Sequence, residues 1–358
     1  MFRLHRTLPM QPLALLLVAA CSRHSDREKV LDDFSETVRI APTDSLDLEQ
    51  FDIFVPDKVI PYGDWYIVGL FSGNNIVDII NPSTQENIHC FRRGRGPGEI
   101  LNTGPIQESD GRLFVFDISK QTYYALDVYE TVKGRQQILK NILNLHDEDD
   151  EKYKNEPLFH TFRLKDLIIA TGLFNDGTWI RLVNDNGSVL DGIPLVYFKS
   201  TDELSIPQRA AFQLSSFISV RPDGKRGICA MLDCGTFSIF DIDSTCLKER
   251  IRKIYYEPKL YPPPGEMISP AHDRSNVRGF FDVASSDDSI YLLYSGRTRE
   301  TQAELDSECS HLLVYDWEGN PVRRYELEKT INSIYLHEGR IYGTSMHPAS
   351  KIYVYNLP

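Results

Sequence analysis

The sequence lacks any apolar stretch long enough to cross a bilayer as a helix, which takes about 20 residues. It also lacks the signatures of common catalytic and nucleotide sites: no GK[ST], no HExxH and no GxSxG occurs. A Ser-His-Asp set drawn from distant positions stays open, because such triads are recognised by geometry rather than by sequence. The sequence therefore assigns no catalytic residue, and it implies no cofactor and no metal.

The N-terminal segment differs in composition from the rest of the chain. Arg3 and Arg6 give it a positive start, and a short apolar core follows at Leu13–Ala20. This arrangement is typical of a secretory signal, and the apolar core is too short for a membrane helix.

The end of this segment, Val18-Ala19-Ala20-Cys21, resembles a bacterial lipobox, in which cleavage occurs before a lipid-modified cysteine. An ordinary signal with a chance cysteine is the alternative. Several acyl chains on Cys21 would anchor the protein stably without spanning the membrane. We therefore predict a signal peptide at 1–20, a lipid-anchored linker at 21–35 and the folded body at 36–358.

Positive charge is scarce. The net charge is −12, and removal of residues 1–20, which hold two arginines and no acid, lowers it to −14. Nucleic-acid binding relies on clustered Lys and Arg, so a nucleic-acid partner is not expected.

Cysteine is scarce as well, and five cysteines remain beyond Cys21. They show neither a disulfide-framework spacing nor a CxxC metal pair. Cys229 and Cys234 are near enough in sequence to pair, but buried free thiols are favoured. The five are Cys90, Cys229, Cys234, Cys246 and Cys309.

Six copies of one unit, a short turn followed by an apolar strand rich in aromatic residues, recur along the chain. Their offsets are 47, 55, 59, 63 and 51 residues. The copies are GDWYIVGLFS from Gly63, DGRLFVFDIS from Asp110, KDLIIATGLF from Lys165, GKRGICAMLD from Gly224, DDSIYLLYSG from Asp287 and EGRIYGTSMH from Glu338. Most copies are followed by a hairpin, as at 179–195 and 311–328, so each unit predicts an antiparallel meander of about four strands.

Meanders of this kind bury both faces when they stack radially. We therefore predict an all-β fold, a six-bladed β-propeller of four-stranded antiparallel blades. The last unit is one strand short, and the N-terminal segment at 36–43 can supply that strand and close the ring. Two three-unit sandwiches are the alternative, but no linker composition marks their boundaries.

Three long connections at 144–157, 200–211 and 260–280 lead from one predicted unit to the next. In a propeller such connections lie on one face of the disc, and long loops in compact domains are often functional. This face is the predicted binding surface. The acidic stretch at 146–151 within the first loop lacks the spacing of a calcium loop.

The stretch FRRGRGPGEI at 91–100 has glycines spaced GxGxG and no following helical period, so it is not a dinucleotide cradle. We interpret it as a turn between blades, with glycines at positive φ. It resembles the G-x-GPGE-[FI] signature of NHL-type and TolB-like six-bladed propellers of Bacteroidota. The stretches at 279–298 and 312–327 resemble late blades of the TolB-like family, so the resemblance covers essentially the whole mature chain.

Members of the resembled family are mostly envelope lipoproteins of unassigned biochemistry. The resemblance implies a lipid-anchored, non-catalytic binding or scaffold module for a protein, peptide or glycan. A metal-dependent lactonase-like enzyme, or a lyase-like one, is the alternative, since other six-bladed propellers carry such activities. Acidic residues are missing directly after Cys21, which favours the periplasmic side of the outer membrane over the cell surface.

Two groups of side chains are candidate binding residues. Arg95 and Glu99 of the glycine-rich loop can form a ligand site, although a salt bridge or a cap on backbone amides is the favoured interpretation. An arginine cluster in the longest loop would suit a carboxylate or an acidic partner, with ion pairing between blades as the alternative. The candidate binding residues are Arg93, Arg95, Glu99, His272, Asp273, Arg274, Arg278 and Arg297.

Overall fold

The computed structural model describes five stretches of the chain: 25–96, 98–145, 156–265, 267–300 and 307–358. The predicted signal peptide, Cys21, Pro97 and the acidic stretch at 146–151 lie outside the described residues. Within the described stretches, no helix is both long enough and apolar enough to traverse a bilayer.

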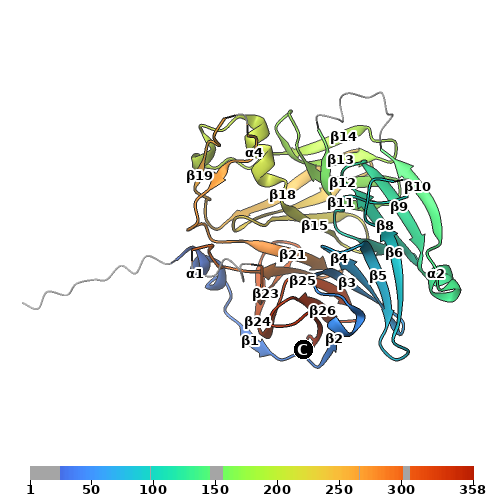
Figure 1. Cartoon of the computed structure of the whole chain (residues 1–358). Coiled ribbons are helices and arrows are strands. Elements are labelled where there is room, and N and C mark those ends of the chain that lie inside the picture. Colours follow the sequence, from blue (N-terminus) through green and yellow to red (C-terminus); the bar gives the residue numbers. More distant parts are fainter. Residues whose placement is uncertain (1–24, 97, 146–155, 266, 301–306) are drawn as a thin grey trace, which may run out of the picture.

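Six antiparallel sheets surround a central axis, which confirms the predicted six-bladed β-propeller (Figure 1). First strands of neighbouring blades, such as β15 and β21, pack side by side around that axis. From the axis outwards, blade one is β3 (Pro56–Tyr62), β4 (Trp65–Leu70), β5 (Asn75–Asn81) and β6 (Glu86–Arg92), and blade two is β7 (Gln107–Ser109), β8 (Arg112–Asp117), β9 (Thr122–Asp127) and β10 (Leu139–Asn144). Blade three is β11 (Leu158–Leu164), β12 (Leu167–Gly172), β13 (Thr178–Asn184) and β14 (Val189–Pro194), and blade four is β15 (Ser216–Val220), β16 (Arg226–Met231), β17 (Thr236–Ile242) and β18 (Leu247–Ile254). Blade five is β21 (Phe280–Ser285), β22 (Ser289–Tyr294), β23 (Cys309–Asp316) and β24 (Pro321–Ile331), and blade six contains β25 (Ser333–His337), β26 (Arg340–Ser345) and β27 (Lys351–Asn356).

Each of the six sequence repeats supplies the tight turn and the second strand of one blade. The second strand is covered by neighbours on both faces, which explains why it reads as an apolar run rather than as an alternating one. One residue from each of five of these strands illustrates the burial, since all are 0% exposed: Ile67, Leu113, Ile169, Ile228 and Leu292. The periodic signal in the sequence is therefore the buried interior of each blade.

The N-terminal segment closes the ring, but through a different strand from the one predicted. β2 (Asp44–Asp47) pairs with β27 and completes blade six. β1 (Thr37–Ile40), within the predicted segment, instead adds a fifth, parallel strand to blade five beside β24. Pro42 cannot donate to a ladder, and the chain crosses between the two blades around it. In Figure 1 both blue strands lie beside the red C-terminal strands.

The predicted linker contributes to the packed body. Helix α1 (Asp26–Leu31) starts at Ser25, whose side chain and that of Glu28 form a capping box. Val30, Leu31 and Phe34 are 0, 9 and 7% exposed and join the core shared by blades three to five. The folded part of the chain therefore begins within 21–35, ahead of the boundary drawn at residue 36.

The connections from each blade's outermost strand to the next blade's innermost strand lie on one face, here called the loop face. The β14–β15 connection carries η2 (Lys199–Thr201) and α4 (Ile206–Gln213), and the β18–β21 connection carries β19 (Leu260–Tyr261) and β20 (Ala271–His272). Elsewhere, η1 (Glu49–Phe51) precedes β3 and α2 (Val128–Gly134) joins β9 to β10. The long loops at 200–211 and, apart from residue 266, 260–280 therefore lie on the predicted face, whereas most of the loop at 144–157 falls outside the described residues.

All five cysteines beyond Cys21 are free thiols. Four are buried as predicted, whereas Cys246 is exposed in a turn of blade four. The favoured interpretation of the cysteines is thus confirmed for all but Cys246.

Candidate functional site

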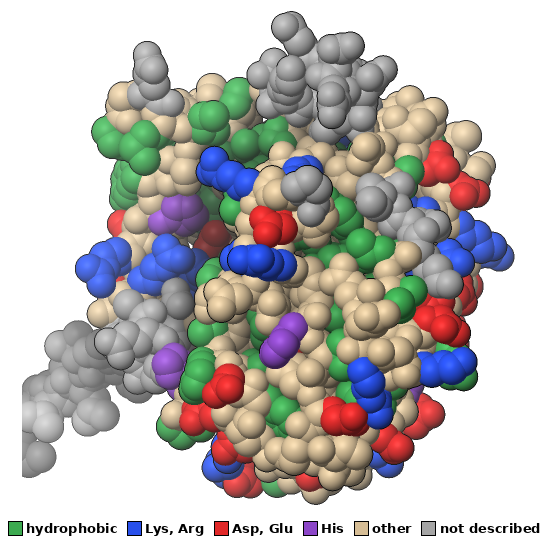
Figure 2. Space-filling view, turned by 45° about the vertical axis from the view of Figure 1, so that its right-hand side comes forward, with side chains coloured by type: hydrophobic (Ala, Val, Ile, Leu, Met, Phe, Trp, Pro, Cys, Tyr) green, Lys and Arg blue, Asp and Glu red, His purple; other side chains and the backbone are tan. Residues whose placement is uncertain are grey.

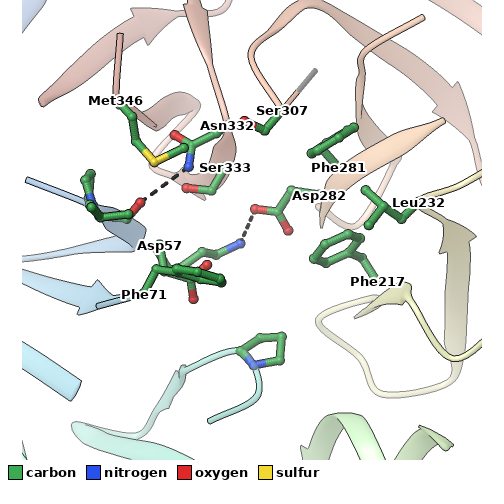
Figure 3. A pocket seen from close by; sticks show the side chains of 14 residues that line it. Asp57, Phe71, Phe217, Leu232, Phe281, Asp282, Ser307, Asn332, Ser333 and Met346 are labelled. Atoms are coloured by element: carbon green, nitrogen blue, oxygen red, sulfur yellow. Dashed lines mark hydrogen bonds and ion pairs between the residues drawn. The ribbon is translucent and has the colours of Figure 1, made fainter. Parts of the chain in front are cut away.

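A cavity of about 350 Å³ opens at the loop-face end of the central axis, and we call it the mouth cavity (Figure 3). In an antiparallel blade the first strand begins, and the second strand ends, at the same face. Residues at those positions in five blades therefore converge on one point. The lining comprises Val55, Pro56, Asp57, Lys58, Phe71, Pro105, Phe217, Leu232, Phe281, Asp282, Ser307, Asn332, Ser333 and Met346.

Two consecutive residues from β3, Asp57 and Lys58, line the mouth cavity. Successive side chains of a regular strand point to opposite faces. The β3–β4 ladder, however, shifts register between Pro56 and Lys58. A bulge of this kind re-aims a side chain, which accounts for both charged groups reaching one cavity.

The facing first strand, β21, has the same irregularity. Its register with β22 shifts between Phe280 and Asp282. As a result Phe281 and Asp282, although adjacent in sequence, both line the mouth cavity. Bulges on opposite walls therefore concentrate polar and aromatic groups at the channel mouth.

Lys58 and Asp282 form an ion pair at the floor of the cavity. Lys58 Nζ lies 2.6 Å from Asp282 Oδ2, and the two side chains are 14 and 8% exposed. The same Oδ2 accepts the Ile334 amide at 2.7 Å, and Oδ1 accepts the Val283 amide at 2.9 Å. Both oxygens of Asp282 are thus satisfied, as a buried carboxylate requires.

Asp57 differs from Asp282, because its carboxylate forms no hydrogen bond or ion pair with any described residue. Burial, and secondly the nearby Asp282 carboxylate, raise the pKa of Asp57 to about 6, while Lys58 opposes the shift. The site thus holds one paired and one unpaired carboxylate.

Asp57→Asn should stabilise the protein at neutral pH. The unfolded side chain, with a pKa of 3.8, ionises before the folded one, whose pKa is about 6. Between these values the stability of the wild type falls as the pH rises, because the folded state binds more protons. We expect the variant to be more stable by roughly 1–3 kcal/mol above pH 6 and equally stable below pH 4. Urea unfolding of both proteins from pH 3.5 to 8 measures this, and a constant difference would contradict the assignment.

Aromatic rings form much of the remaining wall. Phe71 follows directly after β4 and is 73% exposed, an unusual degree for a large apolar side chain beside a cavity. Phe217 packs edge-on against His160 at 5.1 Å, and the Arg278 guanidinium lies 5.1 Å from the centre of the Phe281 ring. In Figure 3, Asp57 lies beside Phe71, opposite the group formed by Phe217, Leu232 and Phe281.

The channel continues below the ion pair as a second space of about 430 Å³. Lys58 and Asp282 border both spaces, so the pair separates the mouth cavity from the channel. His160 borders the lower space, and burial lowers the pKa of its imidazole to about 4. Within the described stretches, no three His, Cys, Asp or Glu side chains group closely enough to hold a metal ion.

The glycine-rich loop is held together by its own glutamate. Glu99 Oε2 accepts the Gly96 amide at 2.8 Å, and Oε1 lies 3.6 Å from Arg92 Nε. A Cβ at Gly94 or Gly96 would overlap the Glu99 carboxylate. The prediction of positive φ is wrong for these two glycines and holds for Gly98, at 75°. Glycine at positions 94 and 96 therefore leaves room for the Glu99 side chain.

Arg93 and Arg95 of that loop point to different surroundings. Arg93 donates to the Leu70 carbonyl at 3.0 Å and to the Phe71 carbonyl at 3.3 Å, whereas Arg95 is exposed. Arg93 therefore braces the segment that carries the exposed Phe71 ring.

The predicted arginine cluster lies on the opposite side of the mouth. Arg278 Nη1 is 2.5 Å from Asp233 Oδ1, and the Arg278 amide donates to the Arg297 carbonyl at 2.7 Å. Arg274 donates to the Arg299 carbonyl at 3.1 Å.

Two further residues of the predicted cluster have local partners. Asp273 accepts Tyr261 OH at 3.1 Å. His272 lies 5.5 Å from the Phe212 ring, and burial lowers the pKa of its imidazole.

None of the eight predicted binding residues lines the mouth cavity. Arg93 and Arg278 instead support its walls through Phe71 and Phe281.

The fold agrees with the comparison to protein families. A family model described as TolB-like 6-blade propeller-like matches residues 81–339. The chain belongs to this TolB-like family. No curated protein matches it in sequence.

Solved structures resemble this TolB-like propeller only at low identity. A luciferin-regenerating enzyme has 9% identity and a TM-score of 0.49 over 88% of this chain and 95% of its own. A protein of unknown function from Bacteroides caccae has 11% identity and a TM-score of 0.47 over 78% and 85%. BamB from Moraxella catarrhalis has 13% identity and a TM-score of 0.39 over 89% and 100%. At such scores these likenesses carry no argument about the site.

Sequence reasoning missed Asp57, Lys58 and Asp282 in this TolB-like propeller, because it searched the loops rather than the first strands. One signal was available: these residues are charges at the starts of otherwise apolar strands. Burying a charge is costly unless it is paired, so such positions are candidates for a site. The bulges that bring them together have no comparable sequence signal.

Proposed function

We propose that the protein is a non-catalytic binding or scaffold module and that its ligand, part of a protein, peptide or glycan, enters the mouth cavity. The observation that supports this most is the cavity itself. Ligand sites are typically concave, largely apolar and about 300–1,000 Å³ in volume, with a few converging polar groups. The mouth cavity has these properties and lies at the ends of rigid strands.

A blocking variant tests this proposal. Val55→Trp places a large ring in the mouth cavity, whereas Leu190→Trp adds the same ring to a groove on the opposite face. Both proteins, once shown by circular dichroism to be folded, are screened by NMR against charged and neutral fragments and short glycans. Binding that Val55→Trp abolishes and Leu190→Trp preserves would support the proposal. A screen in which no ligand depends on Val55 would overturn it.

The surface charge fits a partner other than nucleic acid. Basic and acidic side chains are interspersed over the described residues of the face seen in Figure 2, rather than gathered into a basic band. Ion pairs between basic and acidic side chains also occur elsewhere in the described residues, as between Arg226 and Asp241 at 3.1 Å and between Arg226 and Glu318 at 3.0 Å.

We also propose that the chain is anchored in the cell envelope by lipid on Cys21. Cys21→Ser should move the protein from the membrane fraction to the soluble fraction, because several acyl chains are then lost. Cys246→Ser is the matched control, since Cys246 is an exposed cysteine of the folded body. Fractionation and metabolic labelling with a fatty acid measure the outcome, and membrane retention of Cys21→Ser would refute the anchor.

The proposed location is the outer membrane of a member of the Bacteroidota, with the propeller facing the periplasm. This rests on the resemblance of the sequence and on the residues Ser22-Arg23-His24-Ser25, which include no acid. Protease added to intact cells should then leave the protein uncut, and cleavage before lysis would place it on the cell surface.

A further inference from the structure

The mouth cavity has an excess of one negative charge among its lining residues. Its ionisable side chains are Asp57, Lys58 and Asp282. The Lys58 ammonium lies against Asp282 at 2.6 Å, which leaves the ionised form of Asp57 without a counter-ion. An anionic ligand would therefore meet net repulsion, while a cationic ligand would complete a second ion pair.

The backbone holds Asp57 at the cavity. Its neighbour Pro56 pairs with Leu70, and the Pro56 carbonyl accepts Asn332 Nδ2 at 3.3 Å. On the other side, Lys58 pairs with Gly69 and is fixed by Asp282. Because Pro56 and Lys58 are both fixed, the Asp57 carboxylate is held at the cavity before any ligand binds.

The ring of Phe71 supplies a second feature that suits a cation. A cation over an aromatic face is attracted by the negative face of the ring. Phe71 is 73% exposed and lies beside Asp57 in Figure 3. The opposite wall already shows this type of contact internally, since the Arg278 guanidinium lies 5.1 Å from the centre of the Phe281 ring.

Much of the remaining wall is apolar and would hold an apolar body, although Ser307, Asn332 and Ser333 also line the cavity. Val55, Pro105, Leu232 and Met346 contribute carbon surface around the polar floor. A volume of about 350 Å³ accommodates one ring or alkyl chain with its charged head. The cavity is thus amphipathic, with a negative floor below an apolar rim.

We propose that the mouth cavity binds an organic cation, an ammonium or guanidinium head on an apolar body, with Asp57 as the counter-ion and Phe71 against the head group. This inference rests on the proposed function, in which the same cavity is the binding site. The cation can belong to a small molecule or to a lysine or arginine side chain of a peptide. Burial of an unpaired carboxylate destabilises the free protein, and a bound cation relieves that penalty.

Three probes of one shape test the charge preference: phenethylammonium, neutral 2-phenylethanol and anionic phenylacetate. Binding is measured by calorimetry and NMR on residues 25–358. We expect phenethylammonium to bind at least about tenfold more tightly than the other two. Its affinity should fall about tenfold from pH 7.5 to pH 5, as Asp57 with its pKa of about 6 takes up a proton. N-acetyl-lysine amide and N-acetyl-arginine amide are tested in the same way, and their binding would indicate that a peptide side chain supplies the cation.

Two pairs of variants assign the effect to residues. Asp57→Asn should abolish the preference for the cation, while Asp166→Asn, an exposed aspartate in the β11–β12 turn, should keep it. Phe71→Leu should weaken binding several-fold, while Tyr129→Leu on α2, 58% exposed in the wild type, should not. Phe71→Leu removes only an exposed ring, so it tests the site independently of the change at Asp57.

The outcomes separate the two proposals. Equal binding of the neutral or anionic probe, or cation binding unchanged in Asp57→Asn, overturns the cation inference. If none of these probes binds but other ligands are lost in Val55→Trp, the cation inference fails and the proposed function stands. If no ligand of any charge depends on Val55, both proposals fail.

Discussion

Lys58→Met should destabilise the protein by about 3–5 kcal/mol, because it leaves the Asp282 carboxylate buried without its cation. Asp282 is 8% exposed, and two backbone amides still hold its oxygens in place after the substitution. Methionine keeps the length and most of the volume of the lysine stem. The expected loss of stability therefore comes from the uncompensated charge of Asp282 and not from a cavity in the packing. Urea unfolding at pH 7 gives the free energy of unfolding.

The double variant Lys58→Met/Asp282→Asn distinguishes a charge effect from a packing effect. Replacing both members of a buried ion pair by uncharged groups is often close to neutral. The double variant should therefore recover most of the stability that Lys58→Met loses, giving a coupling energy of about 2 kcal/mol or more. Additive losses, or a single variant that costs less than about 1 kcal/mol, would contradict a tightly coupled pair.

Deleting residues 25–35 should destabilise the propeller by about 5 kcal/mol or prevent it from folding. Val30, Leu31 and Phe34 are buried, and the Phe34 ring meets Tyr315 at 5.1 Å. Truncating one such side chain typically costs about 2–5 kcal/mol. Asp33 adds contacts to Lys253 Nζ at 2.8 Å and to Tyr255 OH at 2.6 Å. Thermal unfolding of 25–358 against 36–358 measures the effect.

Phe34→Ala is the milder version of this test and should cost about 3–5 kcal/mol. Lys29→Ala in the adjoining helix α1 is its control, because Lys29 is 46% exposed and pairs with Asp26, whose side chain is 40% exposed. Such a surface pair contributes at most about 1 kcal/mol. Equal stability of the 25–358 and 36–358 proteins would show that α1 does not hold the blades together.

The repeats predicted the fold well because blade interiors carry a strong and regular signal. Each second strand is largely apolar, and a turn precedes it, so the number of blades can be counted from the sequence. The closing strand was harder to predict. β2 has the sequence Asp44-Ser45-Leu46-Asp47, and its side chains are mostly exposed. The segment that contains β1 was predicted as the closing strand instead, because Val38 and Ile40 make it more apolar. Edge strands bury little and so leave little pattern.

The site was less predictable than the fold, for a physical reason. Asp57 and Lys58 share a cavity only because a register shift interrupts the alternation of β3. No residue type marks that shift, and the partner Asp282 lies 224 positions away from Lys58. The packing of α1 was equally hard to predict, because Asp26–Leu31 is short and mostly polar in composition. Its buried side chains, Val30 and Leu31, join a core that blades three to five form in the folded protein.

If Cys21 carries lipid as proposed, the docked helix α1 limits the distance between the propeller and the membrane surface. Ser25, the first described residue, already caps the packed helix α1, and it lies four positions after Cys21. A fully extended chain of that length reaches roughly 14 Å. A propeller held this closely would stay within a thin layer of solvent next to the bilayer. Its encounters would favour ligands that share that layer, whose effective concentration is raised by confinement to the same surface.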